Sequence, residues 1–219
     1  MLFRSVIADM QEDRGQALAQ ELGESTRFCK VEVRQESEVK GAIDLAVSEW
    51  GQLDCIFNNA GFGGVLGPIE KTPVDEFDMT MEVLVRGVFL GIKHAAPIMK
   101  AQGGGSIINT ASIAGLAAGR GPHVYSAAKA AVIQLTRFLA HQLGPAGITA
   151  NAIAPITTLT PRVAALRTKE DVERIASQVP LRRLATPEDS AQAMLFFASD
   201  AAAYLNGVAL DVNGGRVMM

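Results

Sequence analysis

Short apolar runs alternate with longer amphipathic segments along the whole chain. The runs predict β-strands over Ser5–Asp9, Phe28–Val33, Leu53–Asn58, Ser106–Asn109, Thr149–Ile153 and Val208–Val212. Strands that are apolar throughout are typical of a parallel sheet that is covered on both faces. The pattern therefore predicts a buried parallel sheet.

The segments between these runs carry helical periodicity and predict helices over Glu12–Leu22, Ser37–Trp50, Thr72 to about Lys100, Val124–Leu143, Lys169–Gln178 and Pro187–Ser199. Gly23 is expected to cap the first helix, and Thr72 and Pro73 are expected at the N-cap and N1 positions of the third. Residues Asn59–Gly67 and Ala154–Thr168 are expected to form loops.

Strands that alternate with helices predict a doubly wound α/β fold, with helices on both faces of a parallel sheet. The 219 residues, of which 48% are hydrophobic, suffice for one sizeable core. No repeat, low-complexity tract or linker divides them. We expect a single domain over residues 1–219.

Charge and composition exclude several classes of function. A formal net charge of −3 provides no basic footprint, so a nucleic-acid partner is not expected. The two cysteines lie in strand-like runs and the three histidines are scattered, so we expect neither a metal site nor a disulfide framework.

Membrane association is also not expected. The most apolar helical stretch, residues 83–99, is interrupted by Arg86, Lys93 and His94. It therefore lacks the run of about 20 apolar residues that a membrane span needs. No signal peptide is visible before the first expected strand. These features favour a cytoplasmic protein.

Tyr125 and Lys129 stand four positions apart, a spacing that places both side chains on one face of a helix. Tyrosine alone titrates near pH 10, and a neighbouring ammonium group favours the phenolate and lowers that pKa. Such a phenol suits acid–base chemistry at an alcohol or ketone, with Ser112 holding the substrate oxygen. The alternative is a surface Tyr–Lys pair and a turn serine.

The positions of other polar residues favour the functional interpretation. Asp9, Asn58 and Ser112 all lie at or just beyond the expected ends of strands. The carboxyl ends of parallel strands meet at one edge of the sheet, and ligands bind there in doubly wound folds. With Tyr125 and Lys129 on the helix after Ser112, all five residues are expected to line one crevice.

The chain closely resembles the short-chain dehydrogenase/reductases over essentially its whole length. The resemblance rests on the runs Asn58–Gly61, Ile107–Ser112, Tyr125–Lys129, Asn151–Pro155 and Gly207–Gly215. It implies a Rossmann-like domain and an oxidoreductase that transfers a hydride reversibly between a nicotinamide cofactor and a secondary alcohol or ketone.

Three catalytic roles follow from the resemblance. Tyr125 corresponds to the general acid/base and Ser112 to the hydroxyl that polarises the substrate oxygen. Lys129 corresponds to the residue that lowers the pKa of the tyrosine and binds the nicotinamide ribose. Tyr125 and Lys129 are therefore expected to contact the cofactor as well.

The resemblance also implies contacts at both ends of the cofactor. Asn58, Ala60 and Gly61 belong to a segment that passes the adenosine side and steadies the sheet, and a purely structural role fits them equally well. Pro155 ends the run that lies beside the nicotinamide.

Asp9 is expected to select the cofactor. An acidic residue at this strand end binds both ribose hydroxyls and repels a 2′-phosphate, which favours NAD over NADP. A helix-capping role is the alternative for Asp9. Glu32 and Val33 match the family's acidic residue and valine near the adenine; for Glu32 the alternative is a solvated charge.

The start of the chain departs from the family pattern. A dinucleotide-binding fold places its glycine-rich phosphate loop about 20 residues before the ribose-binding acid, and only eight residues precede Asp9. We expect an N-terminally truncated sequence without the first strand and helix. Two strand edges should then be unpaired and NAD affinity should be low.

Two single residues depart as well. Leu84 stands where the family has an asparagine that interrupts the long helix and holds a proton-relay water, so slower turnover is expected; a tolerated core leucine is the alternative. Ile156 stands where glycine is usual, and a β-branched residue disfavours some backbone conformations open to glycine.

The expected substrate is an apolar ketone or secondary alcohol, because the lid position, residues 154–178, is moderately apolar. Residues 61–67 and 119–123 should complete the pocket. His123 is expected to be a solvated loop histidine, with substrate contact as the alternative.

The long helices over residues 72–100 and 124–143 are apolar on more than one face, which favours a homodimer or homotetramer. The competing function is a catalytically silent relative that acts only by oligomerising or by binding a partner.

Overall fold

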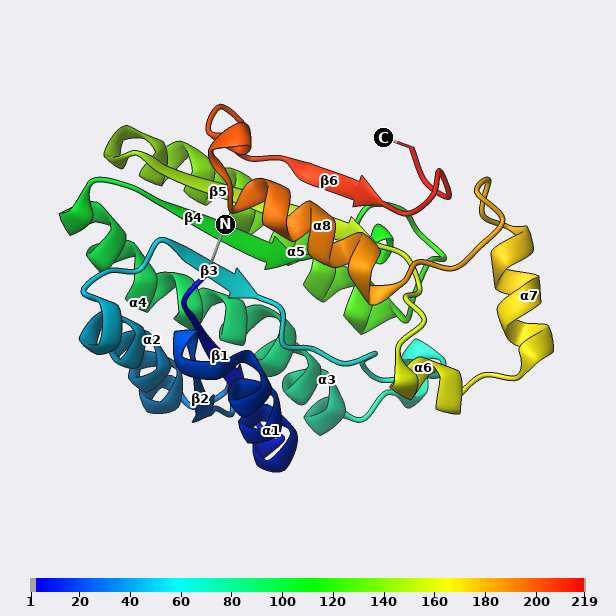
Figure 1. The fold of residues 1–219 in the computed structure, drawn as a ribbon. Helices are drawn as coiled ribbons and strands as arrows, with labels where there is room; N and C mark the ends of the chain where they lie inside the picture. The colour runs from blue at the N-terminus through cyan, green and yellow to red at the C-terminus, as the bar shows by residue number, and fades with distance from the viewer. Residues whose placement is uncertain (1–2, 219) are drawn as a thin grey trace.

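The computed structural model describes residues 3–218, and within them the strands form two parallel sheets (Figure 1). The first sheet pairs β1 (Ser5–Asp9) with β2 (Thr26–Lys30). The second has the order β3 (Cys55–Asn58), β4 (Gly105–Thr110), β5 (Ile148–Pro155) and β6 (Ala209–Val212). The α/β fold with parallel strands that the sequence predicts is confirmed.

The helices connect successive strands and cover both faces of the larger sheet. They are α1 (Glu12–Leu22), α2 (Glu36–Trp50), α3 (Val74–Met81), α4 (Gly87–Gln102), α5 (His123–Leu143), α6 (Pro161–Ala165), α7 (Lys169–Ser177) and α8 (Pro187–Phe197). In Figure 1, α8 lies on one face of the sheet and α4 and α5 on the other. Helices α6 and α7 lie beyond the carboxyl ends of the strands.

Alternation within β4 explains why helices are needed on both faces. Ile107 and Ile108 are both fully buried, and consecutive strand residues point to opposite faces. Ile107 packs in the cluster that contains Val132 of α5. Ile108 packs in the cluster that contains Phe197 of α8. Each face therefore has its own apolar core.

Several element boundaries differ from those expected. Strand β2 ends at Lys30 rather than Val33, because its ladder with β1 ends at the Asp9–Lys30 pair. The segment expected as a loop over 154–168 contains α6, which the Thr160 side chain caps by accepting from the Val163 N–H at 3.2 Å. Helix α3 starts at Val74 with Pro73, not Thr72, at the N-cap.

The long helix expected over 72–100 is interrupted. A π-helical turn, Glu82–Arg86, separates α3 from α4, and Leu84 lies in it, fully buried. The interruption that the family's asparagine is said to cause is therefore present with leucine. Such turns occur frequently at functional sites.

Strands β1 and β3 each have one edge without a partner strand within residues 3–218. Strand β1 pairs only with β2, and β3 pairs only with β4. The two unpaired edges expected from the sequence are thus present in the described part of the chain. Residues 1, 2 and 219 of the expected domain lie outside that part. No helix among the described residues is long and apolar enough to cross a membrane.

Candidate active site

Helix α5 presents Tyr125 and Lys129 one turn apart, as their spacing predicts. The Lys129 side chain is buried, and its Nζ lies 5.7 Å from the centroid of the Tyr125 ring. Nζ donates a hydrogen bond of 2.6 Å to the carbonyl oxygen of Thr110, the last residue of β4. This bond fixes the ammonium group at the carboxyl end of the sheet.

Ser112 stands two residues beyond β4 and caps a short 3₁₀ turn, Ile113–Gly115. Its hydroxyl oxygen accepts from the Ala114 N–H at 3.2 Å and lies 3.5 Å from the Pro155 carbonyl oxygen, to which it donates. The second bond is long, and interactions at such distances are weak. The Ser112 hydroxyl can therefore turn toward another acceptor.

Burial controls the protonation of the buried pair. It raises the pKa of Tyr125, and a hydrogen bond with the Ser112 hydroxyl opposes that rise. It lowers the pKa of Lys129 from 10.5 to about 8. Burial thus favours the neutral form of both groups. A lowering of the tyrosine pKa by Lys129, expected from the sequence, stays a prediction.

A close backbone approach joins the Ser112 turn to α5. A Cβ atom added at Gly115 would lie 2.6 Å from the Lys129 carbonyl carbon and 2.7 Å from the Ala130 nitrogen. Real Cβ atoms essentially never come so near to backbone atoms. Glycine at this position therefore lets Ser112 lie against the helix that carries Tyr125.

We expect Gly115→Ala to lower the free energy of unfolding by about 1–3 kcal/mol, because neither backbone can yield to the added methyl group. Urea unfolding measures this loss. The matched control is Gly41→Ala in α2, where an added Cβ has no atom within 4 Å. There a gain of about 0.5–1 kcal/mol is expected. If the two variants were equally stable, the close approach of Gly115 to α5 would not require glycine.

A buried polar chain ties two strands to α5. Asn58 Nδ2 donates to Asn109 Oδ1 at 2.8 Å, and Asn109 Nδ2 donates to Thr136 Oγ1 at 2.9 Å. Thr136 in turn donates to the Val132 carbonyl oxygen at 2.7 Å. The Asn58 side chain therefore lies in a network that steadies the sheet, which is one of the two roles expected for it.

Leu84 and Ile156, the two residues that depart from the family pattern, are both buried in the structure. The Leu84 side chain approaches the loop after β3, since a Cβ added at Gly61 would lie 3.1 Å from its Cδ2. Ile156 is buried in a cluster with Val179 and Ala185. Among the described non-glycine residues only Arg182 has a positive φ, so the Ile156 backbone does not adopt a conformation reserved for glycine.

Of the expected adenosine-side residues, Asp9 ends β1, and Glu32 and Val33 follow β2. Asp9 Oδ1 accepts from the Gln11 N–H at 2.8 Å, but Gln11 is the N-cap of α1 and the helix has no side-chain cap bond, so Asp9 does not cap it. Its other carboxylate oxygen has no hydrogen bond within residues 3–218. Glu32 accepts from the backbone and guanidinium of Arg34 at 3.2 and 3.1 Å, and the guanidinium bond lowers the pKa of that carboxyl. Val33 lies against Gly87 of α4.

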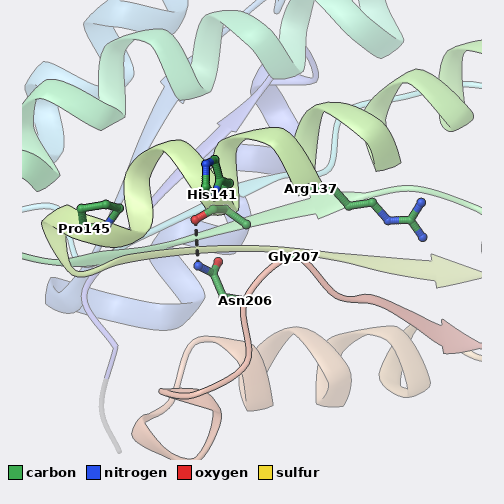
Figure 2. A pocket seen from close by; sticks show the side chains of 6 residues that line it. Arg137, His141, Pro145, Asn206 and Gly207 are labelled. Carbon is green, nitrogen blue, oxygen red and sulfur yellow. Dashed lines mark hydrogen bonds between the residues drawn. The ribbon is translucent and has the colours of Figure 1, made fainter.

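The pocket drawn in Figure 2 lies elsewhere. It has a volume of about 590 Å³ and is lined by Arg137, Ala140, His141, Pro145, Asn206 and Gly207. The dashed bond joins Asn206 Nδ2 to the Ala140 carbonyl oxygen at 2.9 Å. Arg137 follows Tyr125 by twelve helical residues, about 18 Å along the axis. This pocket is therefore separate from the Ser112–Tyr125–Lys129 site.

Comparison with known proteins identifies the family of the chain. Residues 3–216 match the family model described as enoyl-(acyl carrier protein) reductase. The chain belongs to the short-chain dehydrogenase/reductase family. A (+)-borneol dehydrogenase 2 from Salvia officinalis is 40% identical to this chain over an alignment of 233 residues. The alignment covers 98% of this chain and 82% of that protein.

A second curated relative and a solved structure support the same family. The 3-alpha-(or 20-beta)-hydroxysteroid dehydrogenase of Mycobacterium tuberculosis is 37% identical, with coverage of 97% of this chain and 79% of that protein. The crystal structure of a 3-ketoacyl-(acyl-carrier-protein) reductase from Brucella melitensis, complexed with NADH, has a TM-score of 0.88 and 32% identity. It covers 98% of this chain and 88% of that one. The family and its oxidoreductase class, expected from the motifs, are confirmed.

Sequence reasoning missed the residues that hold the site together. Gly115, Asn109 and Thr136 were assigned no role, although the first two lie in or beside the Ile107–Ser112 run. Spacing identifies side chains on one helix face, but these three act between elements that are distant in sequence.

Proposed function

We propose that this protein transfers a hydride reversibly between NAD(H) and an apolar secondary alcohol or ketone, with Tyr125 as general acid/base. The observation that carries the proposal is the convergence of Tyr125, Lys129 and Ser112 at the carboxyl ends of β4 and β5. The buried Lys129 is joined to the end of β4, and Ser112 to Tyr125 and Pro155.

The residues divide the chemistry among themselves. In alcohol oxidation Tyr125 accepts the hydroxyl proton while the carbinol carbon loses a hydride, and in ketone reduction it donates that proton. The Ser112 hydroxyl binds the substrate oxygen. The nicotinamide cofactor, when bound, accepts or supplies the hydride. In reduction Lys129 supplies the proton that Tyr125 has donated, and in oxidation neutral Lys129 takes up the proton that Tyr125 has accepted. Burial lowers the pKa of Lys129 to about 8, so both of its forms are accessible near neutral pH.

The described residues fit much of such a cofactor. One Asp9 carboxylate oxygen has no hydrogen bond within residues 3–218 and is available to a ribose diol. Glu32 and Val33 are assigned to the adenine, and Lys129 is assigned to the nicotinamide ribose. The remaining assigned contacts are Asn58, Ala60, Gly61, Tyr125 and Pro155. Within residues 3–218 no glycine-rich turn opens a helix beside Asp9, so no pyrophosphate contact is assigned. The NADH in the Brucella structure supports a nicotinamide cofactor.

The substrate class rests on the lid segment and on the relatives. Leu159 and Leu166 expose apolar side chains from the segment that carries α6, beyond the strand ends. Two relatives are named for borneol and for hydroxysteroids, which are apolar ring compounds with secondary hydroxyl groups. A bulky apolar alcohol therefore fits better than a charged sugar.

The proposal is tested by NADH fluorescence titration and by turnover of borneol and a 3-hydroxysteroid with NAD⁺, with a sugar phosphate for comparison. We expect turnover of at least one apolar alcohol and none of the sugar phosphate. Turnover of the sugar phosphate alone would refute the substrate class. NADH binding without turnover of any secondary alcohol would favour the catalytically silent alternative.

Asp9→Asn is expected to weaken selection of NAD⁺ over NADP⁺ by about tenfold or more, a change of about 1.4 kcal/mol. The substitution removes the charge that repels a 2′-phosphate and weakens the acceptor for ribose hydroxyls. The ratio of kcat/KM values for the two cofactors measures it. Asp13→Asn, an exposed carboxylate of α1, is the control and should leave the ratio unchanged. An unchanged ratio in Asp9→Asn would show that Asp9 does not select the cofactor.

Association of copies is part of the proposal. Phe89 of α4 and Phe138 of α5 are 49% and 61% exposed, an unusual exposure for phenylalanine. A homodimer or homotetramer would bury them. Sedimentation equilibrium determines the mass in solution.

A further inference from the structure

The loop between β3 and α3 forms a wall beside Tyr125. Gly64 has a φ of +71° and lies so close that an added Cβ would be 3.1 Å from the Tyr125 Cβ. Val65, the next residue, is buried and anchors the loop with its side chain. Four glycines lie between residues 60 and 67, so the chain itself supplies little stiffness.

Hydrogen bonding to this loop is sparse. Within residues 3–218, the backbone groups of residues 60–67 make one hydrogen bond, at the Gly67 carbonyl oxygen. Its partner is Nε2 of His123 at 3.2 Å, and the same nitrogen lies 3.2 Å from Thr72 Oγ1. One imidazole therefore contacts the chain on both sides of Pro68.

The donor in this contact follows from its partners. A carbonyl oxygen only accepts, so His123 Nε2 carries the hydrogen. The Thr72 hydroxyl donates to the Pro68 carbonyl oxygen at 3.3 Å, which leaves its lone pairs for Nε2–H. The imidazole N–H is thus shared between Gly67 and Thr72.

His123 is also well placed for holding the loop. It is the first residue of α5, two positions before Tyr125, and it is half-buried. The solvated loop histidine expected from the sequence is therefore wrong: the residue is helical and its Nε2 is occupied. Movement of Gly67 away from the first turn of α5 has to break this contact.

We propose that His123 is a positioning residue that latches the 60–67 loop to the first turn of α5. The latch holds the wall beside Tyr125 in place and so sets how a bulky substrate is oriented over the tyrosine hydroxyl. This effect on substrate rests on the proposed function, whereas the hold on the loop does not.

The test compares His123→Ala with His123→Gln, whose side-chain amide can donate from a similar position. His141→Ala, an exposed histidine near the other end of the same helix, is the matched control. Backbone ¹⁵N relaxation at Gly63, Gly64 and Gly67 reports loop order. Steady-state kinetics with borneol report KM and kcat separately, and NADH titration reports cofactor binding.

In His123→Ala we expect the order parameters of the three glycines to fall from about 0.85 to about 0.6 or lower. The KM for borneol should rise by about three- to tenfold with a kcat close to wild type, as one lost hydrogen bond predicts. NADH affinity should not change. His123→Gln should restore both readouts, and His141→Ala should resemble wild type.

Unchanged order parameters in His123→Ala would overturn the latch, whatever the kinetics. If the order parameters fell in His123→Ala but the KM for borneol did not change, His123 would hold the loop without orienting the substrate. That result would overturn the proposed effect on substrate. If the wild type turns over no secondary alcohol, the proposed function fails, and the relaxation data still decide whether His123 holds the loop.

Discussion

Tyr125→Phe is expected to lower kcat/KM for alcohol oxidation by about 10²–10⁴-fold, the usual contribution of a positioned acid or base. The substitution removes only the hydroxyl oxygen, so the ring keeps its place against Gly64 and Gly121. Steady-state kinetics with the best alcohol found for the wild type measure the loss. Far-UV circular dichroism should show an unchanged fold.

The pH dependence of the wild type supplies a second readout for Tyr125. Oxidation needs the deprotonated phenol and reduction needs the protonated one. Because burial raises the pKa of Tyr125, oxidation should increase with pH into the alkaline range, while reduction should persist there.

Tyr204→Phe is the matched control, because Tyr204 is fully exposed and undergoes the same chemical change. Its activity should equal that of the wild type. If Tyr125→Phe retained activity within a few-fold of Tyr204→Phe, another group would have to be the acid/base.

Lys129→Met is expected to abolish most activity and yet to stabilise the protein at pH 7. Burial lowers the pKa of Lys129 from 10.5 to about 8, which corresponds to a cost of about 3 kcal/mol for the charged form. Loss of the bond to the Thr110 carbonyl oxygen offsets about 1–2 kcal/mol of the gain. A net rise of about 1–2 kcal/mol in the free energy of unfolding remains.

The sign of the pH dependence follows from the same shift. Between about pH 8 and 10.5 the unfolded wild type binds more protons at Lys129 than the folded protein does, so its stability at this site rises with pH. The advantage of Lys129→Met should therefore be largest below pH 8 and fade toward pH 10.5. Contributions from other groups cancel when the two proteins are compared.

Urea unfolding of both proteins at pH 7, 9 and 10 measures this difference. Lys40→Met is the control: its ammonium is exposed and paired with Asp44, so the change should stay within about 0.5 kcal/mol at each pH. An advantage of Lys129→Met that grows with pH would show that burial does not govern the Lys129 charge.

Strand and helix positions were predictable wherever the signal is local. Gly23 ends α1 with a positive φ, as its place after an amphipathic segment predicts. Strand β2 was predicted too long at its end, because Val31 and Val33 are apolar but β1 offers no residue opposite them. The π turn at Leu84 was implied only through the family resemblance, since nothing in a leucine predicts a break in a helix.

The sequence by itself determined the family, the order of strands and helices, and the spacing of Ser112, Tyr125 and Lys129. These three features depend on the periodicity of apolar residues and on residues close together in the chain, and both are visible in the sequence. The tertiary structure decided the contact of Gly115 with α5, the bond from His123 to Gly67 and the direction of each pKa shift. Close approach and burial depend on segments about 15 to 60 residues apart, and no local pattern encodes which of them will meet.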